Sequence, residues 1–358
     1  MSKKIQSRNL FVRNKSKSLG FKSYVLWLVA VIAFFYGFVF LFPLVPRAGN
    51  IPEAPVYKVK IKPQSSLAGV ATQLEEQGVG SFPLFIQISA RALFIGSKLK
   101  PGTYLLPTGA SIGKVLLQIA RGDRVRESIA IIPGMTIWQL REVIDAHPAL
   151  IHQTKGISSK DLLQSLGLNY PSVEGIFMPD TYIFDPEEPD INIYRRASQA
   201  MQKQISQAWE QKADKSPIKS PYELLILASI IEKETGRTSD RGQISAVFLN
   251  RLNKAMPLQT DPSVIYGIGS RFDGNLRKTD LRRDSPYNTY MHKGLPPTPI
   301  AMPSLESIQA VVKPAQSTAL FFVARGDGTS HFSNSLAEHE SAVDRYQRKK
   351  SSKADLNK

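Results

Sequence analysis

The apolar positions of the chain begin with one uninterrupted run. From Tyr24 to Leu44 the sequence reads YVLWLVAVIAFFYGFVFLFPL and carries no charge. About 20 apolar residues in a helix cross a hydrocarbon core of about 30 Å. A secretory signal peptide, the alternative, has a shorter apolar region that ends at an Ala-x-Ala-like site, and this sequence has neither property. The run therefore predicts a membrane-spanning helix over residues 24–44.

A second pattern occurs three times between Ile51 and about His147. Each copy is a strand-like run, a proline, a Ser or Thr, and then apolar residues at helical spacing. A hydroxyl residue before such a run is a helix N-cap, because its oxygen accepts a hydrogen bond from a backbone N–H that lacks a partner within the helix. We therefore expect three strand-turn-helix units, with N-caps Ser66, Ser111 and Thr136.

These units resemble LysM modules, small peptidoglycan-binding domains that use a strand-turn-helix start of this kind. The alternative is a βα scaffold that separates the following domain from the membrane. Hydrophobic periodicity reports a core and not a ligand, so the pattern leaves both interpretations open. We expect a linker over residues 45–55, a small βα LysM-like domain over residues 56–147, and a domain boundary near the polar segment 148–168.

Two helices are predicted beyond this boundary. Residues 190–213 carry a single apolar stripe, which indicates a surface helix with a structural role. Residues 221–235, PYELLILASIIEKET, predict a mostly buried helix that ends near Gly236, a candidate C-cap. Glu232 and Glu234 lie at its C-terminal end, where the helix dipole and an apolar wall favour an uncharged carboxyl suited to a general acid. Two solvated glutamates at a helix end are the alternative, because Glu is rarely buried without a task.

Several tracts of the second half are rich in Pro, Gly, Asn and Tyr and poor in helix signal. Such composition is typical of binding loops. The tracts are EGIFMPDTY (174–182), LQTDPSVIYG (258–267), YNTY (287–290), GLPPTPIAMP (294–303) and HFSNSLAEH (331–339).

The net charge of +16 is unevenly distributed. Seven Lys and Arg residues and no acidic residue lie within residues 1–23. By the positive-inside rule this basic tail is cytoplasmic, and everything after the membrane span lies on the other side. The remaining chain is only moderately basic, so a nucleic-acid or other anionic-polymer binder has little support.

The composition also limits the possible sites. The chain has no cysteine, which excludes disulfides and thiolate ligands or nucleophiles. Its five histidines lack the spacing of a zinc motif, so we expect no metal and no cofactor. Residues 347–358 are charged and without apolar periodicity, which predicts a disordered tail.

Taken in order, the motifs resemble the endolytic murein transglycosylases, also called the YceG-like or MltG family. EGIFMPDTY, ASIIEKET, VFLNRL, LQTDPSVIYG, YNTY and GLPPTPI stand in the family's order. The resemblance covers the anchor, the LysM-like part and the segment from Glu174 to about Tyr346. It implies an α+β fold class, in which the membrane helix and LysM-like domain are followed by a mixed α/β catalytic domain over residues 165–346, with an active-site helix and a loop-rich groove.

The resemblance also implies roles for individual residues. The first glutamate of EKE, Glu232, would be catalytic, and Glu234 is the second candidate because it faces another side of the helix. Asp261 and the tyrosines each have a structural alternative, as a turn residue or as packed rings. The implied walls of the glycan groove are Gln259, Asp261, Tyr266, Tyr287, Asn288 and Tyr290.

An enzyme of this family would cut the β-1,4 bond between N-acetylmuramic acid and N-acetylglucosamine without water. Glu232 would protonate the glycosidic oxygen and then take the proton of the C6 hydroxyl, which closes a 1,6-anhydro ring. The implied setting is the bacterial inner membrane, with the catalytic domain in the periplasm. Nascent glycan strands would be the substrate and penicillin-binding synthases the partners. A non-enzymatic, membrane-tethered peptidoglycan-binding scaffold is the alternative.

Overall fold

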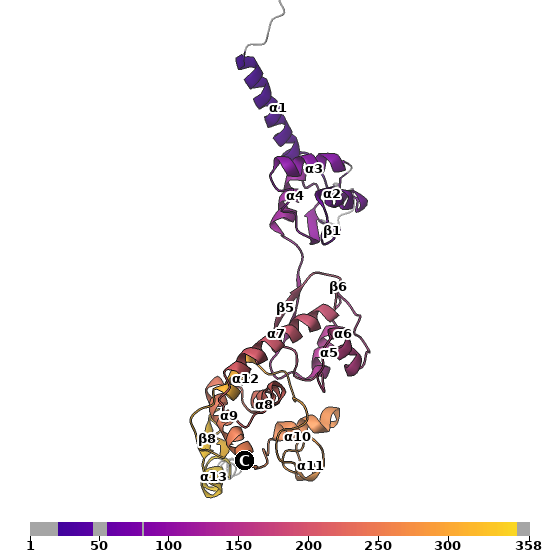
Figure 1. The fold of residues 1–358 in the computed structure, drawn as a ribbon. Helices are drawn as coiled ribbons and strands as arrows, with labels where there is room; N and C mark the ends of the chain where they lie inside the picture. The colour runs from indigo at the N-terminus through magenta and orange to yellow at the C-terminus, as the bar shows by residue number, and fades with distance from the viewer. Residues whose placement is uncertain (1–20, 46–55, 81, 349–358) are drawn as a thin grey trace, which may run out of the picture. The chain divides into compact units, whose positions relative to one another are not determined.

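The computed structural model describes residues 21–45, 56–80 and 82–348. The chain divides into two compact units, Met1–Val125 and Arg126–Lys358, and each has its own hydrophobic core. Figure 1 labels the elements of both. Residues 1–20 of the expected basic tail, residues 46–55 of the expected linker and residues 349–358 of the expected disordered tail lie outside the described residues.

The predicted apolar helix is present as α1, Phe21–Leu41. Within the described residues it is the one helix long and apolar enough to cross a membrane. It ends three residues earlier than predicted, because the chain turns into the first unit there. Pro43 forms a β-bridge with Ser111, and the Leu44 N–H donates to the Ala110 carbonyl at 2.8 Å. Leu44 is therefore buried in the core of the first unit.

The first unit is a two-stranded sheet covered by helices. β1 (Val56–Ile61) pairs antiparallel with β2 (Gly102–Pro107), so that Val56 lies opposite Pro107 and Ile61 opposite Gly102. Two of the predicted N-caps are confirmed, since the Ser66 and Ser111 hydroxyls accept from the N–H groups of Gly69 and Lys114. The helices are α2 (Leu67–Glu76), α3 (Pro83–Ala92) and α4 (Ile112–Arg121).

The third strand-turn-helix copy folds as predicted but belongs to the second unit. Its strand β3 (Glu127–Ile131) pairs antiparallel with β5 (Asp180–Phe184), and its helix α5 (Ile137–Asp145) begins after Thr136 in a capping box with Gln139. The division between the units therefore falls at Val125, earlier than the boundary expected near residues 148–168. The pairing of β3 with β5 joins segments about 50 residues apart, which local periodicity does not reveal.

Helix α8 (Pro221–Glu234) lies at the centre of the second unit. Every residue from Leu224 to Ile231 is buried, because α7 (Ile191–Glu210), α9 (Thr238–Asn253) and α12 (Leu305–Val312) pack around it. The helices predicted over residues 190–213 and 221–235 are thus confirmed. The predicted C-cap at Gly236 is wrong, since the extended backbone of Thr235 ends α8.

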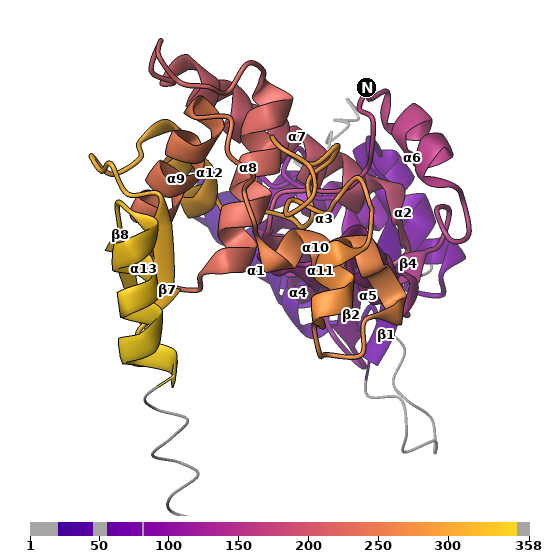
Figure 2. The same ribbon diagram turned by 90° about the horizontal axis from the view of Figure 1, so that it is seen from below.

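The remaining elements complete the second unit. In Figure 2, α13 lies against the hairpin of β7 and β8. The predicted combination of one N-terminal apolar helix with a mixed α/β fold is confirmed. These elements are β4 (Leu150–Ile151) paired in parallel with β6 (Glu188–Pro189), α6 (Ser159–Leu166), α10 (Asp261–Ile268), α11 (Lys278–Arg282), β7 (Phe321–Ala324), β8 (Ser330–Ser333) and α13 (Leu336–Val343).

Candidate functional site

The two glutamates at the end of α8 point in different directions. Successive helical residues are rotated by about 100°, so two residues separated by one position lie on nearly opposite faces. Glu232 faces α9 and α12, and Glu234 faces the loop that leads into α10. The two carboxyl groups therefore have separate surroundings.

Glu232 is held by a dense set of donors. Arg241 forms an ion pair with it at 3.2 Å, and the Glu232 side chain is 6% exposed. The Ser304 N–H donates at 2.9 Å and the Ser307 hydroxyl at 2.7 Å, and the Ser304 hydroxyl donates as well. Ser304 is the N-cap of α12, so the carboxylate lies where a helix N-terminus favours negative charge. These polar surroundings differ from the apolar wall expected beside Glu232.

Glu234 faces a cavity of about 380 Å³. Burial raises the pKa of its carboxyl from 4.5 to about 7, and the charge of Asp261 raises it too, while the Thr260 hydrogen bond and Arg251 lower it. A carboxyl with this pKa exists in both protonation states near neutral pH, as an acid/base catalyst requires. The other residues that line the cavity are Arg251, Leu258, Gln259, Asp261, Tyr290, Phe321, Phe322, Leu336 and His339.

The loop that carries Gln259 is fixed at two points. Arg251 donates to the Leu258 carbonyl at 2.7 Å and to the Leu320 carbonyl at 2.7 Å. The Gln259 N–H donates to the Thr289 carbonyl at 3.0 Å. Gln259 has φ +52°, a left-handed conformation that is uncommon for residues other than glycine. Strain of this kind persists where surrounding contacts impose it, often at functional sites.

Asp261, Asn288 and Tyr290 meet in one hydrogen-bonded group. The Tyr290 hydroxyl donates to Asp261 at 2.6 Å, and both residues line the cavity. Asn288 is 1% exposed and donates to the carbonyls of Leu281 and Arg283 at 3.1 and 2.7 Å. Its own side-chain oxygen accepts from the Tyr290 N–H. Asn288 thus holds the loop that presents Tyr290.

Tyr266 and Tyr287 lie in a second group. Tyr266 is on α10, the helix that begins at Asp261, and Tyr287 lies in the loop after α11. Tyr266 stacks on Trp138 with ring centroids 5.0 Å apart and meets Tyr287 edge-on at 4.9 Å. Trp138 is 41% exposed, so the stack offers an aromatic face to solvent. The hydroxyl of Tyr287 is paired with Thr298 at 2.9 Å. The predicted site residues therefore form two groups, one around Glu234 and one around Tyr266.

A buried glutamate, Glu174, supports the second group. Its carboxyl accepts from the Tyr266 hydroxyl at 3.1 Å and from the backbone N–H groups of Ile137 and Gly175. Burial raises its pKa from 4.5 to about 7, and these donors, together with Lys233, lower it. Through Ile137 it ties the start of α5 to α10.

Three contributors were not identified from the sequence. Glu174 opens the tract EGIFMPDTY, which the sequence identifies as a loop-like family motif without assigning a role to its glutamate. Trp138 lies in the third strand-turn-helix copy, which was assigned to the LysM-like domain. Arg251 lies in the motif VFLNRL, but the sequence gives that motif no site role, and only tertiary contacts place Arg251 at the cavity.

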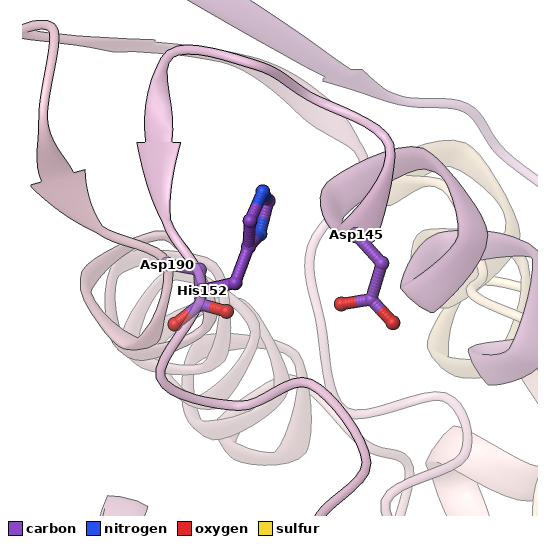
Figure 3. A group of neighbouring side chains, drawn as sticks. All are labelled: Asp145, His152 and Asp190. Carbon is purple, nitrogen blue, oxygen red and sulfur yellow. The ribbon is translucent and has the colours of Figure 1, made fainter.

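One group of side chains in the described residues has the composition of a metal site. Asp145, His152 and Asp190 place their ligand atoms within 4.8 Å of one another, and Figure 3 shows Asp145 facing the other two. Both oxygens of Asp190 already accept hydrogen bonds from the backbone of Gln153 and Thr154 and from the Thr154 hydroxyl. Asp190 thus orders the loop after β4, and this role accounts for its burial.

With this geometry established, the chain can be compared with known proteins. Residues 59–345 match the YceG-like family. The chain belongs to this family. The match takes in both compact units, so the first unit is part of the family's shared architecture and not an unrelated addition.

Relatives of the YceG-like chain carry names that state an activity. An endolytic murein transglycosylase of Bacillus subtilis is 32% identical over 67% of this chain and 68% of the relative. An endolytic murein transglycosylase of Streptococcus pneumoniae is 29% identical over 80% of this chain, but this chain covers only 57% of that protein's length. A crystal structure of a YceG-like protein from Listeria monocytogenes aligns with a TM-score of 0.51 and 27% identity, over 80% of this chain and 98% of the other.

Proposed function

We propose that the chain is a peptidoglycan lytic transglycosylase that cuts within glycan strands. Its membership of the YceG-like family and the names of its relatives support the activity. The observation that carries the proposal is the position of Glu234, a carboxyl with a pKa of about 7 at the wall of a cavity that also contains Gln259, Asp261 and Tyr290.

The geometry favours Glu234 over Glu232 as the acid/base. Glu232 is paired with Arg241 and accepts hydrogen bonds from two serines, and its carboxylate is nearly inaccessible. A general acid must reach the oxygen that it protonates and must carry a proton at working pH. Glu234 meets both requirements, so we assign catalysis to it and assign to Glu232 the task of joining α8, α9 and α12.

The chemical step needs one acid/base because the substrate supplies the nucleophile. Glu234 protonates the glycosidic oxygen between N-acetylmuramic acid and N-acetylglucosamine, and the C–O bond breaks. The same carboxylate then takes the proton from the C6 hydroxyl of the muramic acid, whose oxygen bonds to C1 and forms the 1,6-anhydro ring. Holding the sugar so that this hydroxyl faces C1 supplies much of the rate.

Two groups of residues position the glycan. Gln259, Asp261 and Tyr290 offer polar groups beside Glu234, and the stacked Trp138 and Tyr266 offer an aromatic face for a sugar ring. Asn288 positions the glycan indirectly, because it holds the loop that presents Tyr290. Tyr287 positions it indirectly by packing against Tyr266.

The N-terminal part places the enzyme on its substrate. Helix α1 is a single-pass anchor in the bacterial inner membrane, with the basic tail in the cytoplasm and both folded units outside. The LysM-like strand-turn-helix units of the first unit contact peptidoglycan. Anchoring restricts cutting to nascent strands near the lipid surface, beside penicillin-binding synthases, and thereby ends or trims strand elongation.

The decisive experiment compares Glu234→Gln with Glu232→Gln in the detergent-solubilised full chain. Digests of purified sacculi are analysed by mass spectrometry for anhydro-ended fragments. Glu234→Gln is expected to abolish these fragments without lowering the unfolding midpoint. Glu232→Gln is expected to lower the midpoint, because it leaves Arg241 buried without its ion-pair partner, while each folded molecule still cuts.

Two results would change the assignment. Anhydro fragments from Glu234→Gln, together with none from folded Glu232→Gln, would return catalysis to Glu232. Sacculus binding by the unaltered chain without any cleavage would favour the non-enzymatic scaffold.

A further inference from the structure

We propose that helix α3 of the first unit is embedded in the outer face of the membrane that α1 crosses, and that the groove between α1 and α3 takes lipid acyl chains. The inference rests on the membrane anchor of the proposed function. It adds a second attachment, made by a folded domain and not by the spanning helix.

Helix α3 exposes large apolar side chains on the side away from its core. Ile86 and Ala90 face inward and are fully buried. On the outer side, Leu84 is 67% exposed, and Phe94, just beyond the helix, is 84% exposed, as Phe82 and Ile88 are to lesser degrees. A contiguous exposed apolar face of this kind marks an interaction surface.

This face continues into an apolar groove. A cavity of about 770 Å³ runs between the end of α1 and α3. Its size and apolar character suit hydrocarbon chains. Its walls come from both helices, so lipid that surrounds the end of α1 also reaches the groove. The lining includes Phe38, Phe42 and Leu44 from the α1 side and Phe82, Phe85 and Ile88 from the α3 side.

The length of α1 places α3 at the level of lipid. Lys22 is exposed and marks the inner end of the apolar span. From Ser23 to Leu41 the helix is about 28 Å long at 1.5 Å per residue, and the hydrocarbon core is about 30 Å thick. The span therefore needs all of α1, including its last two turns, to cross the core.

Those last two turns are the part of α1 that α3 contacts. The Tyr36 hydroxyl donates to the Ala92 carbonyl at 3.0 Å. Phe35 and Phe38 meet Phe85 with ring centroids 5.9 and 5.1 Å apart. Residues 35–41 cover about 9 Å of helix. This depth matches the 5–10 Å to which interfacial amphipathic helices bury their apolar faces.

The charge of the same segment favours a lipid surface as the occupant. Between Gln77 and Gly122 the chain has five basic residues and no acidic residue. Arg91, in the last turn of α3, is exposed beside the apolar face. Lys and Arg at such positions lay their stems along apolar surface and reach the headgroups, where anionic lipid attracts their charge.

The absence of cysteine in the chain allows a direct test. Single-cysteine variants of the full chain, Leu84→Cys and Ile88→Cys, are labelled with a fluorophore and placed in nanodiscs of phosphatidylethanolamine and phosphatidylglycerol, one copy per disc. Doxyl-labelled lipid then quenches any fluorophore in contact with it. Ala30→Cys within α1 is the embedded reference, and Glu76→Cys on exposed α2 is the aqueous reference.

Labels at positions 84 and 88 are expected to be quenched several-fold more than the label at 76 and nearly as much as the label at 30. Quenching at 84 and 88 no greater than at 76, with strong quenching at 30, would overturn the inference and leave the anchor intact. Weak quenching at 30 would remove the anchor, and the inference with it. Shielding of positions 84 and 88 from aqueous quencher only when several copies share a disc would assign the α3 face to self-association instead.

Discussion

Glu174 of the second unit is buried and Glu232 and Glu234 are half-buried, and their partners give the three glutamates different properties. Glu232 is paired with Arg241 and accepts hydrogen bonds from Ser304 and Ser307. Among the residues that the structure describes, Glu174 and Glu234 have no ion-pair partner at hydrogen-bonding distance, and burial raises the pKa of each to about 7. Glu234 lies at the wall of a cavity that also contains polar groups. The surroundings, and not the residue type, therefore separate a catalytic candidate from two structural carboxyls.

The pKa of Glu234 predicts the pH dependence of cleavage. The protonated carboxyl is the active acid, so turnover is expected to fall about tenfold per pH unit as the pH rises above about 7. The Thr260 hydrogen bond lowers this pKa, so Thr260→Val is expected to move the alkaline limb to higher pH. Anhydro-product formation measured from pH 5 to 9 tests both statements, and an unchanged limb in Thr260→Val would contradict the assignment.

Glu174 predicts a pH dependence of stability. Its pKa is about 7 in the folded chain and 4.5 in the unfolded chain, so the folded state binds this proton more tightly. The free energy of unfolding therefore falls as the pH rises from 4.5 to 7, by about 3 kcal/mol at 1.36 kcal/mol per pKa unit. Above both values the loss is complete.

Glu174→Gln is expected to remove this part of the pH dependence of the free energy of unfolding. Urea unfolding of the full chain in detergent, followed by tryptophan fluorescence at pH 5 and 7.5, measures this free energy and its slope with pH. Glu234→Gln is measured in parallel, because Glu234 contributes a slope of the same sign and its loss is expected to lower the slope as well. A slope in Glu174→Gln equal to that of the unaltered chain would show that Glu174 ionises normally.

At the scale of elements, the third strand-turn-helix copy makes long-range contacts that its sequence pattern does not indicate. Strand β3 pairs with β5, and the turn between β3 and α5 contacts the end of α8 and the segment before α12. The Gly134 N–H donates to the Met302 carbonyl at 2.8 Å, and Lys233 donates to the Gly134 carbonyl. Helix α5 then presents Trp138 to Tyr266. An element that resembles a binding module in sequence thus supplies one aromatic ring of the group around Tyr266.

Trp138→Ala is expected to weaken glycan binding while preserving the fold. The side chain is partly exposed, so its loss leaves no buried cavity, whereas an aromatic contact contributes about 0.5–1.5 kcal/mol. KM for soluble glycan is therefore expected to rise about threefold to tenfold with little change in kcat. Trp209→Ala on α7, a residue that does not line the cavity of Glu234, is the control for losing a tryptophan. A fall in kcat at unchanged KM would place Trp138 outside the binding surface.

At the scale of the whole molecule, the two compact units have separate cores. The second unit contains every residue of the candidate site, from Trp138 and Glu174 to Glu234 and Tyr290. The first unit contains α1 and the surface proposed to contact lipid. Chemistry and membrane attachment are thus assigned to different units of the chain.

Residues 126–358 expressed alone are therefore expected to fold and to cut soluble glycan. Residues 148–358, which begin at the boundary expected from sequence, are expected not to fold, because they lack β3 and α5 and leave β5 without its pairing strand. Circular dichroism melting curves and anhydro-product assays of the two segments measure this difference. Cooperative folding of residues 148–358 would show that β3 and α5 are dispensable additions.

The sequence by itself determined the elements whose signals are local. Continuous apolarity fixed α1 to within three residues, N-cap chemistry and helical spacing fixed α2, α4 and α5, and a single apolar stripe fixed α7. The ordered motifs also placed the chain in its family. These features depend on neighbours a few residues apart, which the sequence displays directly.

Only the tertiary structure decided which of these elements share a core and which carboxyl faces the cavity. The pairing of β3 with β5 moved the division between the units to Val125. Glu232 and Glu234 both lie in the last turn of the same apolar helix, and the sequence favoured Glu232 only through the family motif. Arg241 and Ser304 surround one of them, and Thr260 and Gln259 adjoin the other. Burial and charge partners come from segments that are distant along the chain, and these set the protonation of a carboxyl.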